Sequence, residues 1–199
     1  MNYRWKLEKH LTLFEKYFKL DEYHISHELF DGGNSQTFTR EIFERGTVVA
    51  VLPFDPKSRE VVLIEQFRAG AVAEPDNPWL IECVAGVIES GESREQVAIR
   101  ESQEEAGCTI KQLYPVTEYY VSPGGTTEYC SLFCGLIDSD GIGGIHGLPS
   151  ENEDIRVFTL DTSEAYAWVK EGRIKSSATL IALLWLQLNE DRLVSEHSA

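Results

Sequence analysis

Alternating apolar and polar residues predict strands in the first 45 residues of the chain. The segments EYHISHELF (22–30) and SQTFTREIF (35–43) alternate on either side of the turn 31–34, DGGN, which is typical of a β-hairpin. Residues 5–18 are ambiguous, because their apolar residues also fit the spacing of a helix: Leu7, Leu11, Phe14 and Phe18. This part of the chain is therefore expected to contain at least one antiparallel strand pair.

After Gly46 the apolar runs become longer and are separated by helical patterns. Strands are predicted at 47–55 and 60–68, around the turn 56–58, and at 79–86, 113–122, 128–137 and 155–160. Helices are predicted from Ser93 to Gly107, from Asp161 to just before Gly172, and at 177–189, the last one amphipathic. Strands interleaved with three helices favour an α+β fold with a mixed, helix-covered sheet. The expected domains are 1–46 and 47–199.

The first predicted helix carries an unusual concentration of acidic residues. Ser93 and Gln96 form a capping-box pattern, and Gly107 is a suitable C-cap. Glu101 and Glu105 share one helix face, where like charges four residues apart destabilise by roughly 0.2–0.5 kcal/mol. Clustered carboxylates suit Mg²⁺, although the same pattern also fits an ordinary solvated acidic face.

The spacing of these residues decides between the two interpretations. It resembles the Nudix box: a Gly, five residues, a Glu, seven residues, then Arg-Glu-x-x-Glu-Glu-x-Gly. The matching residues are Gly86, Glu92, Arg100, Glu101, Glu104, Glu105 and Gly107. With residue frequencies near 6%, seven fixed positions coincide by chance at about 10⁻⁹ per starting position. The pattern expects aliphatic residues where this chain has Ser102 and Cys108. We expect Ser102 to pack against a sheet with its hydroxyl bonded to the preceding turn.

Composition excludes several classes of function. The chain has 199 residues and a formal net charge of −15, without a basic run, so nucleic-acid binding is not expected. The N-terminal sequence MNYRWKLEKH has no apolar core, and no apolar stretch is long enough to span a membrane. The four cysteines show no metal-type spacing, so reduced thiols and a cytoplasmic location are expected.

Two further segments could carry chemistry. The sequence 122–126, SPGGT, is a common turn signal, and Glu128 follows it closely. Its Pro123 stands fifteen residues after Cys108, at the offset that resembles the proline of ADP-ribose pyrophosphatases within the Nudix superfamily. The second segment carries Glu151 and Glu153 on a predicted loop. Such a loop is usually a solvated turn, but phosphoryl chemistry beside a Nudix box needs a general base.

The resemblance to bacterial ADP-ribose pyrophosphatases extends along nearly the whole chain, with the first twenty residues matching least. It rests on segments such as REIFERG (40–46), EVVLIEQ (60–66), SPGGT (122–126), GIHGL (144–148) and ENEDIRV (151–157). The resemblance implies a Nudix α/β/α sandwich with a mixed sheet and an N-terminal antiparallel β-subdomain. It thereby favours strands over a helix at residues 5–18. It also implies a homodimer in which the N-terminal subdomains are exchanged.

The resemblance also implies roles for individual residues. The metal ligands would be the carbonyl of Ala85 and the carboxylates of Glu101, Glu105 and Glu153. Glu151 would be the general base, with Arg100 and Glu104 orienting the ligands. Two or three Mg²⁺ ions would serve as cofactor, with Mn²⁺ as a substitute. Substrate-binding residues would include Arg45 and Arg68 on the diphosphate, Tyr17 and Phe18 on the adenine, and elsewhere Arg40, Glu41, Val87, Ser122, Pro123, Gly124 and Glu128.

The expected function is Mg²⁺-dependent hydrolysis of ADP-ribose, and of similar ADP-sugars, to AMP and ribose 5-phosphate. One alternative is another Nudix enzyme, such as a pyrophosphatase for GDP-mannose or for nucleoside triphosphates. A second alternative is a non-catalytic ADP-ribose sensor, but such a module is expected to lose box carboxylates or to gain a DNA-binding segment. The chain shows neither feature.

Overall fold

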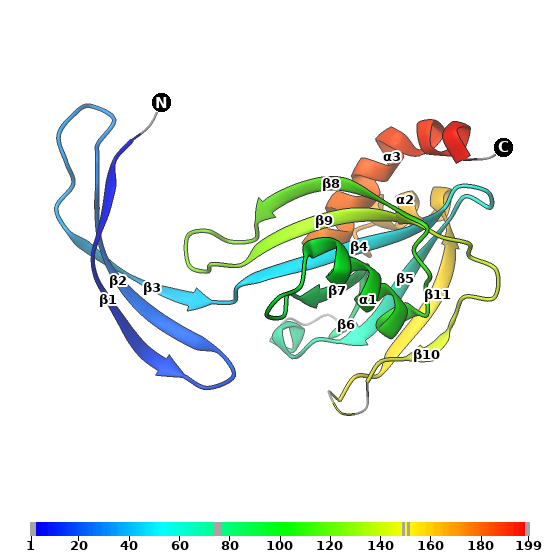
Figure 1. Ribbon diagram of the computed structural model, residues 1–199, viewed down its shortest axis with the longest axis horizontal. Helices are drawn as coiled ribbons and strands as arrows, with labels where there is room; N and C mark the ends of the chain where they lie inside the picture. Colours follow the sequence, from blue (N-terminus) through cyan, green and yellow to red (C-terminus); the bar gives the residue numbers. More distant parts are fainter. Residues whose placement is uncertain (1–2, 74–76, 149, 151, 198–199) are drawn as a thin grey trace. The chain divides into compact units, whose positions relative to one another are not determined.

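The computed structural model describes residues 3–73, 77–148, 150 and 152–197, and Figure 1 labels its elements. The chain forms two compact units. The first contains residues 1–47 and 120–129, and the second contains residues 48–119 and 130–199. The expected domains 1–46 and 47–199 stay a prediction, because a unit that is compact by its contacts is not necessarily a domain that folds independently.

The first unit is built on a three-stranded antiparallel sheet in the order β1-β2-β3. Its strands are β1 (Trp5–Glu15), β2 (Lys19–His27) and β3 (Phe38–Glu44). Strands β2 and β3 pair as the sequence predicts, with Tyr23 opposite Arg40. The helical alternative for residues 5–18 is wrong, because β1 pairs with β2 along its length.

Residues 120–129 belong to this first unit because they bond to the end of β3. The Phe43 N–H donates to the Gly125 carbonyl (2.8 Å), and the Thr127 N–H donates to the Phe43 carbonyl (3.1 Å). The Tyr129 N–H donates to the Gly46 carbonyl (3.2 Å). The segment that carries the Pro-Gly-Gly turn is therefore a partner of the N-terminal sheet.

The second unit contains a mixed sheet in the order β10-β11-β5-β4-β9-β8, in which β6 also pairs with β5 and β7 with β4. Its strands are β4 (Thr47–Asp55), β5 (Glu60–Phe67), β6 (Trp79–Glu82), β7 (Val84–Val87), β8 (Gln112–Tyr120), β9 (Tyr129–Leu136), β10 (Gly144–His146) and β11 (Ile155–Asp161). A short 3₁₀ helix, η1 (Ala69–Ala71), follows β5. The sequence did not predict β10. The predicted strand 79–86 is divided at Cys83, whose N–H donates to the Thr179 hydroxyl (2.8 Å).

Helices cover both faces of this sheet (Figure 1). On one face α1 (Arg94–Ala106) buries Val97 and Ala98 against Val49 and Val51. On the other face lie α2 (Thr162–Lys170) and α3 (Ser177–His197), whose apolar residues pack with Leu52, Phe54 and Leu63. Because successive side chains of a strand point to opposite faces, each strand contributes residues to a hydrophobic core on both sides of the sheet. The predicted α/β/α sandwich is confirmed.

The predicted signals at the ends of α1 are present in the structure. The Ser93 hydroxyl accepts from the Gln96 N–H (3.2 Å), and the Gln96 side chain accepts from the Ser93 N–H (2.7 Å). Gly107 adopts the left-handed conformation, with a φ of 64°. The Ser102 hydroxyl donates to the Ala98 carbonyl (2.7 Å), so this polar residue is buried without an unpaired group.

Helix α3 continues to His197, so the predicted end at residue 189 is wrong. The residues that follow have partners within the fold: Glu190 accepts from the Thr162 hydroxyl (2.8 Å) and the Tyr166 hydroxyl (3.0 Å). Leu193 is fully buried in the core. Polar residues therefore continue the helix because tertiary contacts satisfy them.

The four cysteines are all buried, and none of them forms a disulfide. Burial raises the pKa of Cys83, Cys108 and Cys134 to about 12. In the described part of the chain, none of the helices combines the length and apolarity needed to cross a bilayer.

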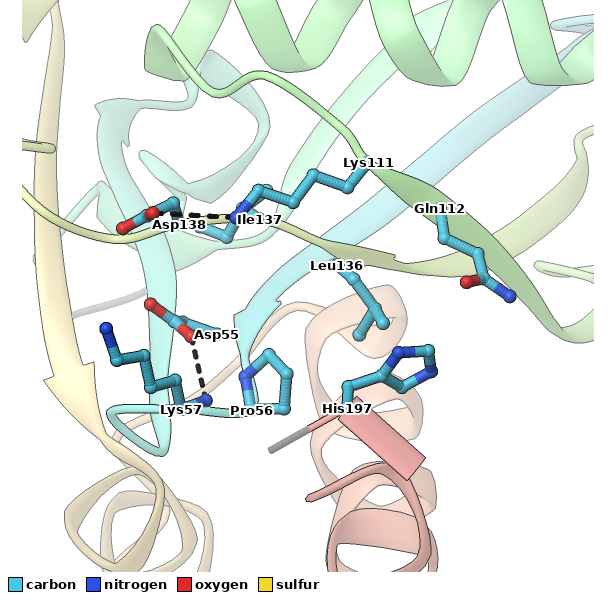
Figure 2. Close-up of a pocket in the computed structure, with 9 residues that line it drawn as sticks. All are labelled: Asp55, Pro56, Lys57, Lys111, Gln112, Leu136, Ile137, Asp138 and His197. Atoms are coloured by element: carbon cyan, nitrogen blue, oxygen red, sulfur yellow. Dashed lines mark hydrogen bonds and ion pairs between the residues drawn. The ribbon is translucent and has the colours of Figure 1, made fainter. Parts of the chain in front are cut away.

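A pocket of about 220 Å³ opens in the second unit between the turn after β4, the start of β8 and the end of α3 (Figure 2). Lys111 forms an ion pair with Asp138 (3.5 Å) in this pocket, and the Lys57 N–H donates to Asp55 (2.8 Å). The full lining is Asp55, Pro56, Lys57, Lys111, Gln112, Leu136, Ile137, Asp138 and His197. None of the predicted site residues lines it.

Candidate active site

The acidic face of α1 lies against β7, and Gly86 is the point of closest approach. A Cβ atom built on Gly86 would overlap the Glu101 carboxylate, so a side chain at this position would displace Glu101. Gly86 has no unusual backbone conformation, so the requirement for glycine is one of space. The first residue of the box pattern is therefore explained by contact with a predicted metal ligand.

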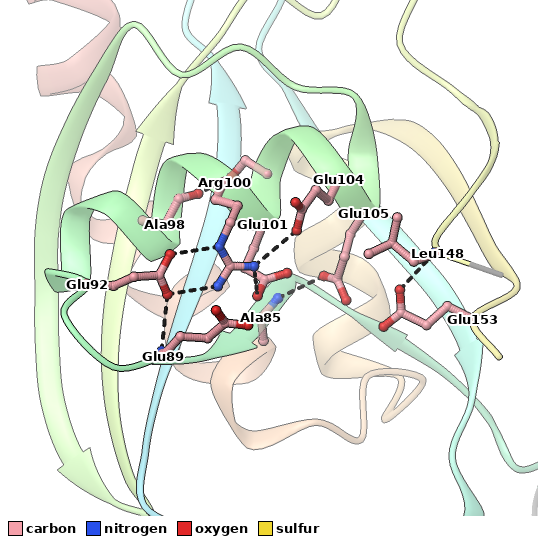
Figure 3. Close-up of polar contacts among 11 residues, drawn as sticks. Ala85, Glu89, Glu92, Ala98, Arg100, Glu101, Glu104, Glu105, Leu148 and Glu153 are labelled. Carbon is pink, nitrogen blue, oxygen red and sulfur yellow. Dashed lines mark hydrogen bonds and ion pairs between the residues drawn. The ribbon is translucent and has the colours of Figure 1, made fainter. Parts of the chain in front are cut away.

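Arg100 is the centre of a network of ion pairs on the exposed side of this face (Figure 3). Its guanidinium donates two hydrogen bonds to Glu92 (2.9 and 3.0 Å), one to Glu101 (2.8 Å) and one to Glu104 (3.0 Å). The bonds from Arg100 lower the pKa of Glu92. The bonds with Glu92, ahead of those with Glu104 and Glu101, raise the pKa of Arg100. Arg100 thus holds Glu101 and neutralises part of the acidic cluster.

Glu105 is the most buried carboxylate of the helix, with 4% of its surface exposed. Its Oε2 accepts a hydrogen bond from the Ala85 N–H (3.0 Å), which fixes its position against β7. Burial, reinforced by the negative charges of Glu101 and Glu153, raises the pKa of Glu105 to about 8. Burial also raises the pKa of Glu101. Both carboxylates therefore favour a nearby positive charge.

Glu153 reaches the same region from the loop between β10 and β11 (Figure 3). Its carboxylate accepts from the Leu148 N–H (3.1 Å), and its own N–H donates to the Leu148 carbonyl (3.3 Å). A Cβ on Gly147 would come within 2.8 Å of the Glu153 Cβ, and Gly147 has a φ of +97°. The backbone at residue 147 thus requires a glycine, both for its conformation and for its close approach to Glu153. The predicted base Glu151 lies outside the described residues.

The predicted ligands Glu101, Glu105, Glu153 and the Ala85 carbonyl are oxygen donors, the type of ligand that Mg²⁺ prefers. The buried Glu105 carboxylate, with its raised pKa, supports the fit because a divalent cation would offset its desolvation. Within the described part of the chain, however, no three His, Cys, Asp or Glu side chains are grouped so that they could hold an ion. Instead, Arg100, Ala85 and Leu148 each donate to one of the three carboxylates.

Arg68 lies beside this acidic group at the end of β5. Its Nε donates to Glu82 Oε2 (2.6 Å), and its charge opposes, without cancelling, the rise in the pKa of Glu105 that burial causes. Because Glu82 is largely buried, the ion pair holds the guanidinium against the sheet. The pair joins neighbouring strands fourteen positions apart, so nothing in the sequence indicated Glu82 as a partner.

A second set of predicted residues comes together within the first unit. The Arg45 guanidinium lies over the Phe18 ring (4.7 Å) and donates to Glu128 (3.4 Å). Tyr17 contacts Phe18 edge-on, with ring centroids 4.7 Å apart, and is 90% exposed. Four predicted substrate residues thus form one aromatic and charged group, of which Tyr17 and Phe18 are exposed and Arg45 and Glu128 are partly buried.

Other predicted substrate residues are not part of either group. Arg40 lies over the Phe38 ring (4.7 Å), and Glu41 lies opposite Glu22 across the strand pair. Val87 is half-exposed at the end of β7. Ser122 and Gly124 lie in the turn before Glu128, and Pro123 lines a cavity of about 650 Å³ with Tyr23, Ile25, Ile42, Thr47, Tyr120, Thr126, Thr127 and Tyr129.

The family model described as the NUDIX domain matches residues 44–179 of the chain. The chain belongs to the Nudix family. The ADP-ribose pyrophosphatase of Escherichia coli (strain K12) is 51% identical over 185 residues, which cover 93% of this chain and 88% of the relative. The Haemophilus influenzae ADP-ribose pyrophosphatase is 45% identical over 92% of this chain and 85% of its own length. This Nudix chain is therefore a hydrolase.

A less similar relative is named for a different substrate. The GDP-mannose pyrophosphatase of Cronobacter sakazakii is 36% identical over 94% of this chain and 97% of its own length. Among solved structures, one described as "Crystal structure of ADP compounds hydrolase" matches with a TM-score of 0.70 over 98% of this chain and 97% of that chain. At 15% identity that match supports the Nudix fold alone.

Proposed function

We propose that the chain is a Mg²⁺-dependent hydrolase that cleaves the diphosphate of ADP-ribose, and of similar ADP-sugars, into AMP and ribose 5-phosphate. The observation that carries this proposal is the arrangement of Glu101 and Glu105 against β7, with Arg100 beside them. The proposed substrate is that named for the 51% identical relative, an ADP-ribose pyrophosphatase.

The proposed metal ligands are Glu101, Glu105, Glu153 and the Ala85 carbonyl. Bound Mg²⁺ would supply charge stabilisation at the reacting phosphate and a more acidic water. Arg100 and Glu104 would keep the ligands oriented, because the same guanidinium bonds both Glu101 and Glu104. Arg68 would bind the diphosphate through its fork of donors while Glu82 holds its side chain in place.

Glu151 is proposed as the general base that accepts the proton of the attacking water. Glu151→Gln should bind Mg²⁺ and substrate about normally but turn over slowly, because only proton transfer is removed. Glu153→Gln should instead weaken Mg²⁺ binding, since it removes a proposed ligand. Calorimetric titration of Mg²⁺ into both variants distinguishes these roles. An equal loss of metal affinity in the two variants would contradict the division.

The proposal extends to the assembly: a homodimer with exchanged N-terminal subdomains, in which each substrate site uses residues of both chains. Support comes from the first unit, where Tyr17, Phe18, Arg45 and Glu128 form one group with exposed aromatic rings. Arg40, Glu41, Val87, Ser122, Pro123 and Gly124 are proposed to line the rest of the substrate. We also propose a cytoplasmic location, because four cysteines that form no disulfide suit a reducing compartment.

A panel of nucleotide sugars tests the proposed activity. The purified protein is incubated with Mg²⁺ and ADP-ribose, ADP-glucose, GDP-mannose or a nucleoside triphosphate, and coupled phosphatase reports the phosphomonoesters released. ADP-ribose should give the highest kcat/KM, and omission of divalent metal should abolish turnover. Preference for GDP-mannose would support the alternative drawn from the 36% identical relative. Binding of ADP-ribose without turnover of any compound would support a sensor.

A further inference from the structure

Gln66 lies on the face of β5 that is turned toward α1. In the antiparallel pairing of β5 with β6, Ile64 is opposite Glu82 and Gln66 is opposite Leu80. Residues two apart on a strand share a face, and Ile64 packs in the core beneath Ala106 of α1. Gln66 therefore points toward the acidic helix, with Arg68 two residues further along on the same face.

The side chain of Arg68 runs back along β5 toward Glu82. The Arg68 N–H donates to the Pro78 carbonyl (2.9 Å), so the Arg68 backbone lies beside the residue that precedes β6. Its guanidinium nevertheless bonds Glu82 (2.6 Å), which lies opposite Ile64. In the register of the two strands, the Gln66–Leu80 pair stands between these two positions. Gln66 is buried there, with 6% of its surface exposed.

The Nε2 of Gln66 is a buried donor with no hydrogen-bond partner among the residues that the structure describes. Buried donors in folded proteins are nearly always paired, and one left unpaired is destabilising. Arg68 cannot satisfy this donor, because a guanidinium has no acceptor. Gln66 Nε2 therefore needs a hydrogen-bond acceptor that can lie close to the positive charge of Arg68. A negatively charged oxygen of a ligand meets both requirements.

We propose that Gln66 is a ligand-binding residue whose Nε2 donates a hydrogen bond to an oxygen of the bound diphosphate, beside the guanidinium of Arg68. This inference rests on the proposed function for the identity of the ligand. Gln66 would then act with Arg68 and Glu82 as one group: Glu82 holds Arg68, and Arg68 and Gln66 together hold the diphosphate. Without the diphosphate, the unpaired amide lowers the stability of the protein.

The test is Gln66→Met, which keeps the length of the side chain and removes its polar atoms. We measure the ligand-free Tm by calorimetry and the Kd for the α,β-methylene analogue of ADP-ribose in Mg²⁺, which is not cleaved. The Tm should rise, because an unpaired buried amide is removed, while the Kd should increase about 10- to 100-fold. Gln66→Glu, which can only accept at neutral pH, should weaken binding further.

Thr179→Val is the matched control, because Thr179 is a buried polar residue whose partner is visible. The Cys83 N–H loses its acceptor in this variant, so the Tm should fall while the Kd stays unchanged. If Gln66→Met also lowers the Tm and leaves the Kd unchanged, Gln66 is a structural residue and the inference is wrong.

A second ligand separates this inference from the proposed substrate. Methylenediphosphonate carries the two phosphate groups without adenosine or ribose. If the wild-type protein fails to bind the ADP-ribose analogue, the proposed substrate is wrong, and the methylenediphosphonate titration still decides the role of Gln66. Weaker binding of methylenediphosphonate to Gln66→Met supports that role, and equal binding overturns it.

Discussion

At the scale of single residues, Gly86 shows how the absence of a side chain can leave room for the side chain of another residue, here Glu101. The Glu101 carboxylate occupies the space where a Cβ would stand. Arg100 donates to the Oε1 of the same carboxylate (2.8 Å), so Glu101 has little freedom to move away. The position of this proposed metal ligand is therefore set by the two neighbours together.

Gly86→Ala should keep the fold and lose most of its activity. The new methyl group would push Glu101 out of its place, so we expect turnover to fall by at least about 10²-fold and Mg²⁺ affinity to weaken. Gly70→Ala is the matched control, because open space surrounds that glycine and its φ is not positive. Steady-state kinetics measures the turnover of both variants, and Mg²⁺ titration compares their metal affinity. Full activity in Gly86→Ala would show that turnover does not require the Glu101 carboxylate to occupy its present position.

Glu105→Gln should fold and lose activity by about 10³-fold, because it removes the charge of a proposed metal ligand. Its metal-free Tm should rise, since the wild-type carboxylate is buried and is repelled by Glu101 and Glu153. Glu95→Gln, at an exposed position on the same helix, is the control and should retain its turnover. Retention of more than a tenth of wild-type turnover by Glu105→Gln at saturating Mg²⁺ would refute the ligand assignment.

How far the sequence predicts such residues depends on how local their contacts are. The contacts of Arg100 with Glu101 and Glu104 lie within one helix, so helical spacing was enough to group them. The Arg68–Glu82 pair and the burial of Gln66 depend on the register of β5 against β6. Register is a property of the folded sheet, so neither could be inferred from one sequence.

At the scale of elements, the same distinction between local and tertiary causes separates α1 from α3. The ends of α1 were predicted correctly, because a capping box and a C-cap glycine are local signals. The end of α3 was placed too early, because its last residues are held by α2 and by the core. Strand β10 was missed for a related reason: three residues are too short for a recognisable alternation.

Substitution of two leucines of α3 tests how much the last part of this helix contributes to the free energy of unfolding. Leu193 is fully buried, and Leu193→Ala should destabilise the protein by about 2–5 kcal/mol through the cavity it leaves. Leu188 is 86% exposed, and Leu188→Ala should change stability by less than about 0.5 kcal/mol. Urea denaturation followed by circular dichroism compares them. Similar midpoints for both variants would mean that the helix beyond residue 189 adds little stability.

At the scale of the whole molecule, residues distant in the sequence belong to one unit. Residues 120–129 bond to β3 and Gly46, and so join the N-terminal sheet rather than the sandwich that surrounds them in sequence. No pattern in the sequence indicated this grouping, because main-chain hydrogen bonds such as those of Phe43 do not depend on residue type. Consequently the proposed substrate residues Arg45 and Glu128 come from two distant parts of the chain and form one ion pair.

The proposed exchange of N-terminal subdomains predicts complementation between two inactive chains. Arg45→Ala removes a substrate residue of the first unit, and Glu105→Gln removes a proposed metal ligand of the second. If Arg45 serves the metal centre of the partner chain, a heterodimer contains one site with both residues intact. Unfolding the two variants together and refolding them should therefore restore activity, up to one working site per heterodimer.

The control for this experiment is the same mixture without the unfolding step, in which chains have not exchanged. Different affinity tags on the two variants allow heterodimers to be purified and counted. Purified heterodimers that remain as inactive as their parents would show that Arg45 serves its own chain.

The burial of all four cysteines has a practical consequence for following ligand binding in solution. Burial raises the pKa of Cys83, Cys108 and Cys134 to about 12, which disfavours the thiolate at pH 7, and the thiolate is the species that reacts with maleimides. Cys130 is 2% exposed and equally inaccessible to a bulky reagent. A cysteine introduced at the exposed Tyr17 would therefore accept a fluorescent dye in the otherwise natural sequence. The dye would report directly whether the nucleotide base reaches the ring of Phe18.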